Sequence, residues 1–472
     1  MSLTELQASA HIQSVHSIRD IRAHKELKAA TSDSNQSLNE SNGIELATLA
    51  RDSESPTAED ISHLSNSEPA SPTPAQKRIE RIRYATLLWA LFLVGWNDGS
   101  TGPLLPRIQE VYHVGYTVVS LLFIFTTVGY LSGSVANVYT VDRFGYGKVN
   151  SFSGSVINIA AAAIQSPAPP FPVLVFSFFL YGFGGALQDS LASGYVATLK
   201  SGTRMSILHS LYGFGAFAAP LVATQFAQME RWSFHYLITL GIAVVNTALL
   251  SFSFRFKTLE ECMAEIGKPI NHTPSGSNTA EDKYRQILRS KEVNLLAFFL
   301  LVYIGVAVTL GGWTVTYVVT VRGGGPNSGY ISSGFYGGLT LGRVALMWVN
   351  KKIGEKRVVY IYMLLSIGLE LVIWLVPSLI GGGIAVSFVG FLFGPIYPIV
   401  MNHAGRIIPP WLLTGSIAWI AGFGQSGSAF VPFITGAIAS KVGIESLQPL
   451  VVGTMGLTLI LWFLVPNHSR LD

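Results

Sequence analysis

Twelve long apolar stretches fill the chain between residues 84 and 466, and they constrain the fold more than any other feature. A helix needs about 20 apolar residues to cross the roughly 30 Å hydrocarbon core of a bilayer. Within that core the backbone must satisfy its own hydrogen bonds, which selects helices or closed barrels. Barrel strands are about ten residues long and alternate in polarity, and these stretches do neither. The sequence therefore predicts an all-α membrane protein. The expected spans are 84–106, 117–138, 149–166, 172–197, 206–227, 233–254, 294–320, 329–349, 358–378, 381–402, 412–436 and 446–465.

The second six stretches repeat the glycine pattern of the first six. Gly129 and Gly338 are 209 positions apart, and so are Gly133 and Gly342. A Gly-Phe-Gly triplet at 213–215 recurs at 422–424, at the same offset. Because the matches run without gaps across six spans, we favour duplication over chance in a chain with 47 glycines. The sequence predicts two pseudo-symmetric six-helix bundles in the same orientation, as in parallel-repeat transporters.

Composition divides the chain into five parts. Only 12% of the residues are charged and 49% are hydrophobic, whereas soluble domains are about 25% charged. The first residues are rich in Ser, Asn and Glu, a composition typical of disorder. The expected parts are a disordered cytoplasmic tail 1–83, an N-terminal bundle 84–255, a cytoplasmic central loop 256–292, a C-terminal bundle 293–466 and a cytoplasmic tail 467–472.

The loop charges predict the orientation in the membrane. Cytoplasmic loops of membrane proteins carry an excess of Lys and Arg. Alternate short loops on one side hold nine such residues and those on the other hold four: Arg143, Lys148, Lys200, Arg204, Lys351, Lys352, Lys356, Arg357 and Arg406 against Arg107, Arg231, Arg322 and Lys441. Both termini are therefore expected in the cytoplasm. We expect a monomer in the plasma membrane, with the vacuolar membrane as the alternative.

Pairs of glycines four residues apart occur in several spans. Gly129 with Gly133, Gly338 with Gly342 and Gly390 with Gly394 each place two small residues on one helix face. Such pairs let a neighbouring helix approach closely. The pattern predicts tight helix contact, which moving bundles and static packing would both use.

Motifs for enzymatic chemistry are missing from the sequence. There is no His-Glu-x-x-His, no phosphate-binding Gly-x-x-x-x-Gly-Lys-Ser/Thr and no Gly-x-Ser-x-Gly. We expect no catalytic residues, no metal and no cofactor. Any transport would then draw on a gradient, and the basic excess in the loops requires no nucleic-acid partner.

The loop after the second span has a recognisable sequence. Asp142-Arg143-Phe144-Gly145-Tyr146-Gly147-Lys148 resembles the signature of the major facilitator superfamily. The family's leading glycine is replaced by Val138. The resemblance implies that Asp142, Arg143 and Gly145 belong to a charge network that latches the two halves. The alternative is a charged loop that only sets the topology.

Longer segments narrow the resemblance. Residues 95–106, His209 to Gly215, Tyr303 to Gly305 with Gly311-Gly312-Trp313, and Gly342-Arg343 with Gly354-Glu355-Lys356 are similar to a fungal branch of this superfamily, distantly related to the bacterial fucose/proton symporter. The resemblance implies a secondary carrier and places Arg343 among the gating residues. One departure is Ala307, where those relatives usually have an acid. If that acid carries the coupled proton, this chain couples elsewhere or not at all.

Charged residues inside the spans are the main pointers to mechanism, because each costs about 2.5–3.5 kcal/mol on insertion scales. They are Asp98, Asp189, Arg343 and Glu370, with His209 near the end of its span. In the family, spans 1, 4, 7 and 10 line the cavity, which implies that Asp98 and Asp189 face the path and that Glu370 does not.

A carboxylate in a partly dry cavity can bind and release a proton near neutral pH. Asp189, beside Gln188, is the first proton-coupling candidate, followed by Asp98 and His209. Asp98 could instead cap a broken helix at Asn97-Asp98-Gly99. Either acid could alternatively form a buried hydrogen bond or ion pair, for example with Arg343 or His209.

Aromatic and amide side chains on spans 1, 4, 7, 10 and 11 could line a substrate cavity. They would suit an amphipathic organic molecule or a sugar ring, although membrane aromatics also serve as packing anchors. The candidates are Trp96, Asn97, Gln188, Trp313, Tyr317, Tyr397 and Gln425.

Together these features predict a secondary active transporter that moves a small organic molecule across a lipid bilayer by alternating access, coupled to a proton gradient. A facilitated-diffusion carrier or an exporter of a secondary metabolite would use the same scaffold. A sensor that signals through its tail without transporting is a further alternative.

Overall fold

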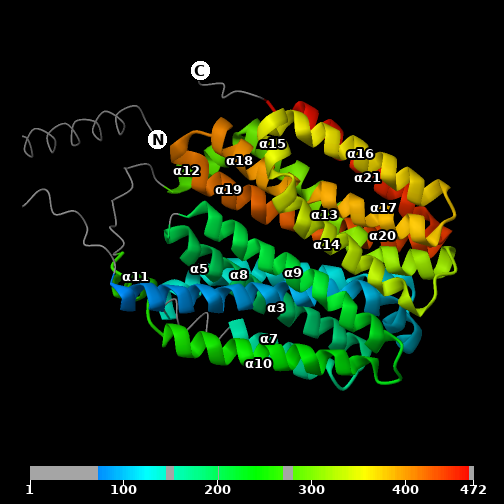
Figure 1. Ribbon diagram of the computed structural model, residues 1–472, viewed down its shortest axis with the longest axis horizontal. Coiled ribbons are helices and arrows are strands. Elements are labelled where there is room, and N and C mark those ends of the chain that lie inside the picture. The colour runs from blue at the N-terminus through cyan, green and yellow to red at the C-terminus, as the bar shows by residue number, and fades with distance from the viewer. Residues whose placement is uncertain (1–72, 145–153, 200, 269–279, 467–472) are drawn as a thin grey trace, which may run out of the picture. The chain divides into compact units, whose positions relative to one another are not determined.

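The computed structural model describes residues 73–144, 154–199, 201–268 and 280–466 (Figure 1). Helices, joined by short turns, account for nearly all of these residues, and no strand occurs among them. The predicted all-α fold is therefore confirmed for the part of the chain that is described.

Helices of the first half follow the predicted spans. The first helix begins at Pro74 rather than at residue 84, because Thr73 and Gln76 form a capping box and Pro74 occupies the first helical position. The part of the N-terminal tail from Pro74 onward is thus helical. The elements are α3 (Pro74–Tyr112), α4 (Tyr116–Val119), α5 (Leu121–Phe144), α7 (Ser155–Gln165), α8 (Phe171–Thr198), α9 (Gly202–Ala227), η2 (Trp232–Phe234) and α10 (His235–Phe254).

The second half continues this pattern with more interruptions. The span expected at 381–402 is broken at Pro395, which has no N–H to donate, and the span at 412–436 is broken at Ser426. The elements are α11 (Leu259–Glu265), α12 (Ala280–Arg289), α13 (Lys291–Val321), η3 (Pro326–Gly329), α14 (Tyr330–Ala345), α15 (Met347–Ile353), α16 (Glu355–Leu375), α17 (Leu379–Phe393), α18 (Ile396–Ile407), α19 (Pro410–Gln425), α20 (Gly427–Val442), η4 (Ile444–Ser446) and α21 (Leu447–Leu464).

Each of the expected spans falls mostly on helix where the structure describes it, apart from short breaks such as those at Pro395 and Ser426. Within the described residues, nine stretches are long and apolar enough to cross a membrane. The other three expected spans lie inside the long α3, at the partly described 149–166, and across the break between α14 and α15.

Equivalent helices pack in the same way in both halves. In the first half α3 packs on α9 and α10, and α5 packs on α8. In the second half α13 packs on α19, α20 and α21, and α14 packs on α17. Figure 1 shows the helices of residues 74–254 in the lower part of the picture and those of 291–464 in the upper part. We call these the N-terminal and C-terminal bundles, and their matching contacts support the predicted duplication.

The paired glycines lie where helices touch. A Cβ on Gly338 would sit 2.1 Å from the Ser387 carbonyl oxygen, and one on Gly342 would sit 1.8 Å from that of Phe391. In the N-terminal bundle, a Cβ on Gly129 would lie 2.1 Å from the Phe179 carbonyl oxygen. The predicted tight helix contact is therefore confirmed at these pairs, between α14 and α17 and between α5 and α8.

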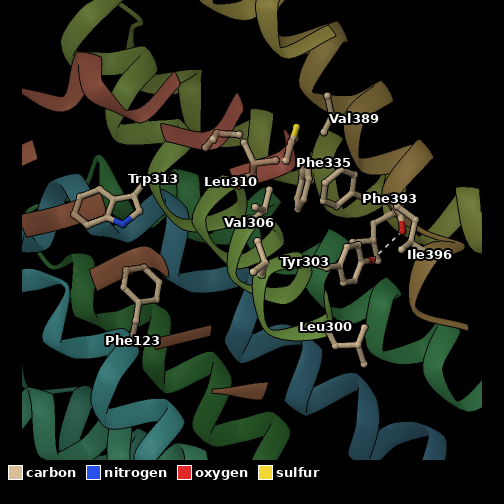
Figure 2. Packing of buried hydrophobic residues seen from close by; sticks show 14 of the residues in the cluster. Phe123, Leu300, Tyr303, Val306, Leu310, Trp313, Phe335, Val389, Phe393 and Ile396 are labelled. Atoms are coloured by element: carbon tan, nitrogen blue, oxygen red, sulfur yellow. Dashed lines mark hydrogen bonds between the residues drawn. The ribbon is translucent and has the colours of Figure 1, made fainter. Parts of the chain in front are cut away.

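The two bundles meet through α9 with α14, α3 with α13, and α5 with α20. Figure 2 shows Trp313 of α13 facing Phe123 of α5, with their ring centroids 6.1 Å apart. We call the side of the helices that carries residues 255–268 and 280–290 the central-loop end. The side that carries the loops near 113–115, 228–231 and 322–325 is called the opposite end.

The two helices of the central loop pack on different bundles. Arg83 of α3 donates to the Cys262 carbonyl at 2.8 Å and forms an ion pair with Glu265, so α11 is held on the N-terminal bundle. In contrast, Ile287 of α12 is 3% exposed and packs against Gly415 of α19 in the C-terminal bundle. The described parts of the loop, 256–268 and 280–292, thus pack on different bundles.

A second ionic contact at the central-loop end involves Glu80. This residue, 5% exposed, pairs with Arg204 of α9 and with Lys268 after α11. Burial alone would raise the pKa of Glu80, but hydrogen bonds and attraction from Arg204 and Lys268 outweigh burial and lower that pKa below its usual 4.5.

Replacement of Gly342 by Ala should lower the apparent melting temperature of the purified protein, because the added methyl group collides with the backbone of α17. Overpacking of this kind costs about 1–3 kcal/mol. Gly368→Ala, on α16, is the matched control, since a Cβ there meets nothing within 4 Å. That control should leave the melting temperature equal or higher, and equal losses in both variants would contradict the close contact.

Glu80→Gln should lower the melting temperature at neutral pH but not in acid. Because the pKa of Glu80 is depressed in the folded protein, its ionised form stabilises the fold above the usual carboxyl pKa, and this contribution is lost as the pH falls through the lowered value. The difference between wild type and variant should therefore shrink below about pH 4. Glu110→Gln, an exposed glutamate, is the control; a difference that persists in acid would argue against the ion pairs.

Candidate functional site

Asp98 of α3 lies between two tyrosines of the N-terminal bundle. The hydroxyl of Tyr181, on α8, donates to Oδ1 at 2.7 Å, and the hydroxyl of Tyr212, on α9, donates to Oδ2 at 2.6 Å. The Tyr181 hydroxyl is also 3.1 Å from the carbonyl oxygen of Val94, one turn before Asp98. The carboxylate is thus satisfied by two neutral donors, and no ion pair of Asp98 occurs among the described residues.

Glycines on α3 and α9 bring these groups together. A Cβ on Gly95 would lie 1.9 Å from the Tyr212 carbonyl oxygen, and one on Gly99 would lie 2.3 Å from that of Ala216. From the other side, Gly215 of α9 faces the backbone of Phe92. Because the two helices touch backbone to backbone, the short side chain of Asp98 reaches the Tyr212 hydroxyl.

Asp189 of α8 is the second carboxylate of the site. Tyr130 of α5 donates its hydroxyl to Oδ2 at 2.7 Å, and Ser193, one turn later on α8, donates to Oδ1 at 3.3 Å. Asp98 and Asp189 are close enough to interact electrostatically. Both acids therefore belong to one polar region of the N-terminal bundle.

The C-terminal bundle contributes a cation and two tyrosines to this region. Arg343 of α14 donates from Nη1 to the His209 carbonyl of α9 at 3.2 Å, across the bundle interface. Both Asp189 and Arg343 interact electrostatically with the His209 imidazole. Tyr336 is an electrostatic neighbour of Asp98, and Tyr397 is one of Asp189. We call this set the polar layer: Asp98, Tyr130, Tyr181, Asp189, His209, Tyr212, Tyr336, Arg343 and Tyr397.

Trp96 lies inside the N-terminal bundle rather than in the polar layer. It is 5% exposed, its Nε1 donates to Thr239 Oγ1 at 3.0 Å, and its ring stacks on His235 with 5.6 Å between centroids. The Nε2 atom of His235 is in turn 2.8 Å from Ser100 Oγ. In this state the indole packs against α10, and its proposed contact with a substrate stays a prediction.

Two further aromatic candidates on α13 also make packing contacts. Trp313 is fully buried between the bundles, where its Nε1 donates to the Pro432 carbonyl at 3.1 Å and its ring packs on Tyr116 and Phe123. Tyr317 is 2% exposed and lies under the guanidinium of Arg322. Their role toward a substrate is likewise untested.

The amide candidates fall into two groups. Gln188 is fully buried, and its Nε2 donates to Ser155 Oγ at 3.0 Å, which joins α8 to α7. Asn97 and Gln425 are partly buried on α3 and α19. Asn97 directly precedes Asp98 and Gln188 directly precedes Asp189, so both are adjacent in sequence to acids of the polar layer.

The structure describes some of the expected gating residues completely and others only in part or not at all. Asp142 and Arg143 fall in the last turn of α5, but their side chains lie outside the description, and Gly145 lies outside the described residues altogether. Arg343 is described and bridges the two bundles. Its Nε is buried without a partner among the described residues.

Sequence reasoning missed the tyrosines of the polar layer other than Tyr397. Tyr130, Tyr181, Tyr212 and Tyr336 sit on spans rich in aromatic residues, where a hydroxyl facing an acid looks the same in sequence as one facing lipid. Of these tyrosines, only Tyr212 could have been singled out from the sequence, since it lies within the segment His209 to Gly215 that resembles the fungal transporters.

Nothing among the described residues points to a metal. No group of three or more His, Cys, Asp or Glu side chains gathers there with the geometry to hold an ion. What the polar layer can do chemically is bind protons and donate or accept hydrogen bonds.

Comparison with known proteins identifies the relatives of this chain. The family model of the Major Facilitator Superfamily matches residues 87–410. Bypass of stop codon protein 6 of Saccharomyces cerevisiae is 24% identical over 417 residues, which cover 83% of each chain. The glucose/mannose transporter GlcP of Bacillus subtilis is 22% identical over 355 residues, covering 73% of this chain and 85% of the relative.

A solved structure agrees on the fold. The E. coli fucose:proton symporter superposes with a TM-score of 0.57 at 15% sequence identity, covering 82% of this chain and 98% of the symporter. The family and fold are those of membrane transporters. Since the family model spans well over half of the sequence, the chain is a member of the major facilitator superfamily, integral to a membrane through multiple helices.

Proposed function

We propose that this protein is a secondary active transporter that moves a small polar organic molecule by alternating access and couples this movement to protons. Membership of the transporter family supports membrane transport in general. The observation that carries the proton-coupled version is Asp98, held between Tyr181 and Tyr212 without a countercharge within ion-pair distance among the described residues.

The hydrogen bonds of Asp98 can be satisfied in both protonation states. When the carboxylate is ionised, both phenol hydroxyls donate to it. When it is protonated, its O–H can donate to the Tyr181 oxygen, and Tyr181 then donates to the Val94 carbonyl, 3.1 Å away. Proton binding would thus change a hydrogen bond between α3 and α8 without leaving a polar group unpaired. Asp189, with Tyr130 and Ser193, is the second coupling site of the proposal.

The chemistry of the polar layer supports a polyhydroxylated substrate. Carboxylates, phenol hydroxyls and a guanidinium can together accept from and donate to several hydroxyl groups. One relative is named a glucose/mannose transporter and one structural neighbour a fucose:proton symporter. We therefore propose a sugar or a similar polyol as the substrate class.

Contacts between the bundles support alternating access. Toward the opposite end, Thr127 of α5 and Ser428 of α20 are 2.8 Å apart, and Thr117 donates to Ser440 at 2.8 Å. A Cβ on Gly102 would lie 2.2 Å from the Gly311 carbonyl oxygen, so α3 and α13 also touch there. We infer that the path is closed at this end in the present state and opens there when the bundles tilt.

The proposal includes an orientation. The basic residues of the short loops gather at the central-loop end, and cytoplasmic loops carry such an excess. We place this end and both termini in the cytoplasm, with the protein in the plasma membrane. Latching through Asp142 and Arg143, with Arg343 on the other bundle, belongs to the same proposal.

Asp98→Asn and Asp189→Asn should each abolish concentrative uptake. Proteoliposomes with an imposed pH gradient would be tested with radiolabelled D-glucose, D-mannose and L-fucose, together with a dye that reports internal pH. Wild type should accumulate one of these sugars with proton entry. An Asn variant cannot carry the proton but keeps the shape of the site, so we expect at least a tenfold loss of accumulation while exchange of labelled for unlabelled sugar persists.

Glu110→Gln is the matched control, because this exposed carboxylate pairs only with Arg107 at the opposite end. It should transport like wild type. Sugar flux without any response to the pH gradient would favour facilitated diffusion. Full accumulation by both Asn variants would disprove coupling through these acids, and accumulation only in inverted vesicles would favour export.

A further inference from the structure

Glu370 is a buried acid that lies outside the polar layer. It sits on α16, its exposure is 0%, and neither carboxylate oxygen has a hydrogen-bond partner among the described residues. Ser366, one helical turn earlier on the same face, is also fully buried, and its hydroxyl is unpartnered too. Buried polar atoms of native proteins are nearly always hydrogen-bonded, so this group calls for an explanation.

Gln448 of α21 completes the group. It is fully buried, its side chain lies beside the Glu370 carboxyl, and both its Nε2 and Oε1 lack a partner among the described residues. Because α16 and α21 pack against each other, the amide and the carboxyl face one another inside the C-terminal bundle. An amide offers both a donor and an acceptor, and so does a protonated carboxyl group.

Among the described side chains, no positive charge is placed to neutralise an ionised Glu370. Two helices packed against α16, namely α17 and α21, contain no titratable side chain. On α13, Tyr317 is the electrostatic neighbour of Glu370, and Arg322 donates from Nη2 to the carbonyls of Ile373 and Trp374 instead of to the acid.

The remaining charges near α16 are at its ends. Exposed Glu445 in η4 lies near the opposite end and is itself an acid. The titratable side chains of α15, α18 and α16 itself lie toward the central-loop end, where Glu355 pairs with Arg406. They are Lys351, Lys352, Glu355, Lys356, Arg357, Tyr360, Tyr362, Tyr397, His403 and Arg406.

We propose that Glu370 is a proton-binding site in the wall of the C-terminal bundle, where the protonated acid and Gln448 form a neutral hydrogen-bonded pair that joins α16 to α21. The carboxyl O–H donates to Gln448 Oε1, and Gln448 Nε2 donates to the carboxyl carbonyl oxygen. Rotation about the last side-chain bond of each residue brings the two groups into this arrangement. The Ser366 hydroxyl can then donate to a remaining oxygen lone pair.

This site differs from the polar layer in what its proton does. A charge left on Glu370 would be buried without a partner, which is strongly unfavourable. The proton therefore stays bound and stabilises the C-terminal bundle, whereas a coupled proton must leave. The inference does not rest on the proposed function, and its test uses no substrate.

The test is infrared spectroscopy of the purified full-length protein, made in an Asp98→Asn/Asp189→Asn background so that the polar layer contributes no carboxylic acid. At neutral pH this protein should show the C=O stretch of one protonated carboxyl group. Glu370→Gln should remove that band, and Glu445→Gln, one turn before Gln448 and exposed, should leave it unchanged. If the band is missing, or survives in Glu370→Gln, the proposal is wrong.

Thermal unfolding gives a second readout. An exchanged double variant keeps the test decisive if Glu370→Gln alone folds poorly. The melting temperature of wild type should fall more steeply between pH 7 and pH 9 than that of Glu370→Gln, whose amide cannot ionise. The exchanged pair Glu370→Gln/Gln448→Glu should recover the infrared band, since it keeps one acid and one amide. A melting temperature that rises with Na⁺ but not with choline would instead make this a sodium site and overturn the proton assignment.

Discussion

The cost of an unpaired polar group inside a bilayer governs how the few charges of this chain are arranged. No water in the hydrocarbon core can replace a missing partner, so each acid needs donors, a proton or a countercharge. Asp98 and Asp189 obtain donors from Tyr181, Tyr212 and Tyr130, whereas Glu370 has no hydrogen-bond partner among the described residues. The same rule thus separates two acids that are stabilised by neutral donors from one for which we propose a bound proton.

Close backbone contact is the second requirement, because short acidic side chains reach their donors only where helices touch. Gly95 and Gly99 of α3 permit this contact with α9, and the repeated glycine pairs permit it within each half. These contacts concern backbones and not particular side chains. They therefore survive duplication even where the side chains around them have diverged.

The distinction between backbone contacts and particular side chains decides which features of the structure could be predicted from the sequence. Apolar length and glycine spacing are local properties, so the spans, the duplication and the tight contacts of Gly338 and Gly342 were predictable. The start of α3 at Pro74 was missed because the helix continues through a polar, non-membrane segment with its own capping box. The tyrosines were missed because the sequence of a helix does not reveal which neighbouring helix contacts each of its faces. Trp96 and Trp313 were predictable as aromatic residues on the first and seventh spans, but their packing within and between the bundles was not.

The duplication also explains why the polar layer is one-sided. Shifted by 209 positions, Asp98, Tyr181 and Tyr212 correspond to Ala307, Gly390 and Ala421, while Arg343 corresponds back to Ser134. The acids with their phenol donors thus lie in one copy, and the cation that bridges to it lies in the other. At the positions equivalent to the two tyrosines, glycine and alanine supply no phenol hydroxyl. Position 307 itself holds alanine, so the acid and its two phenol donors are replaced together in the second copy.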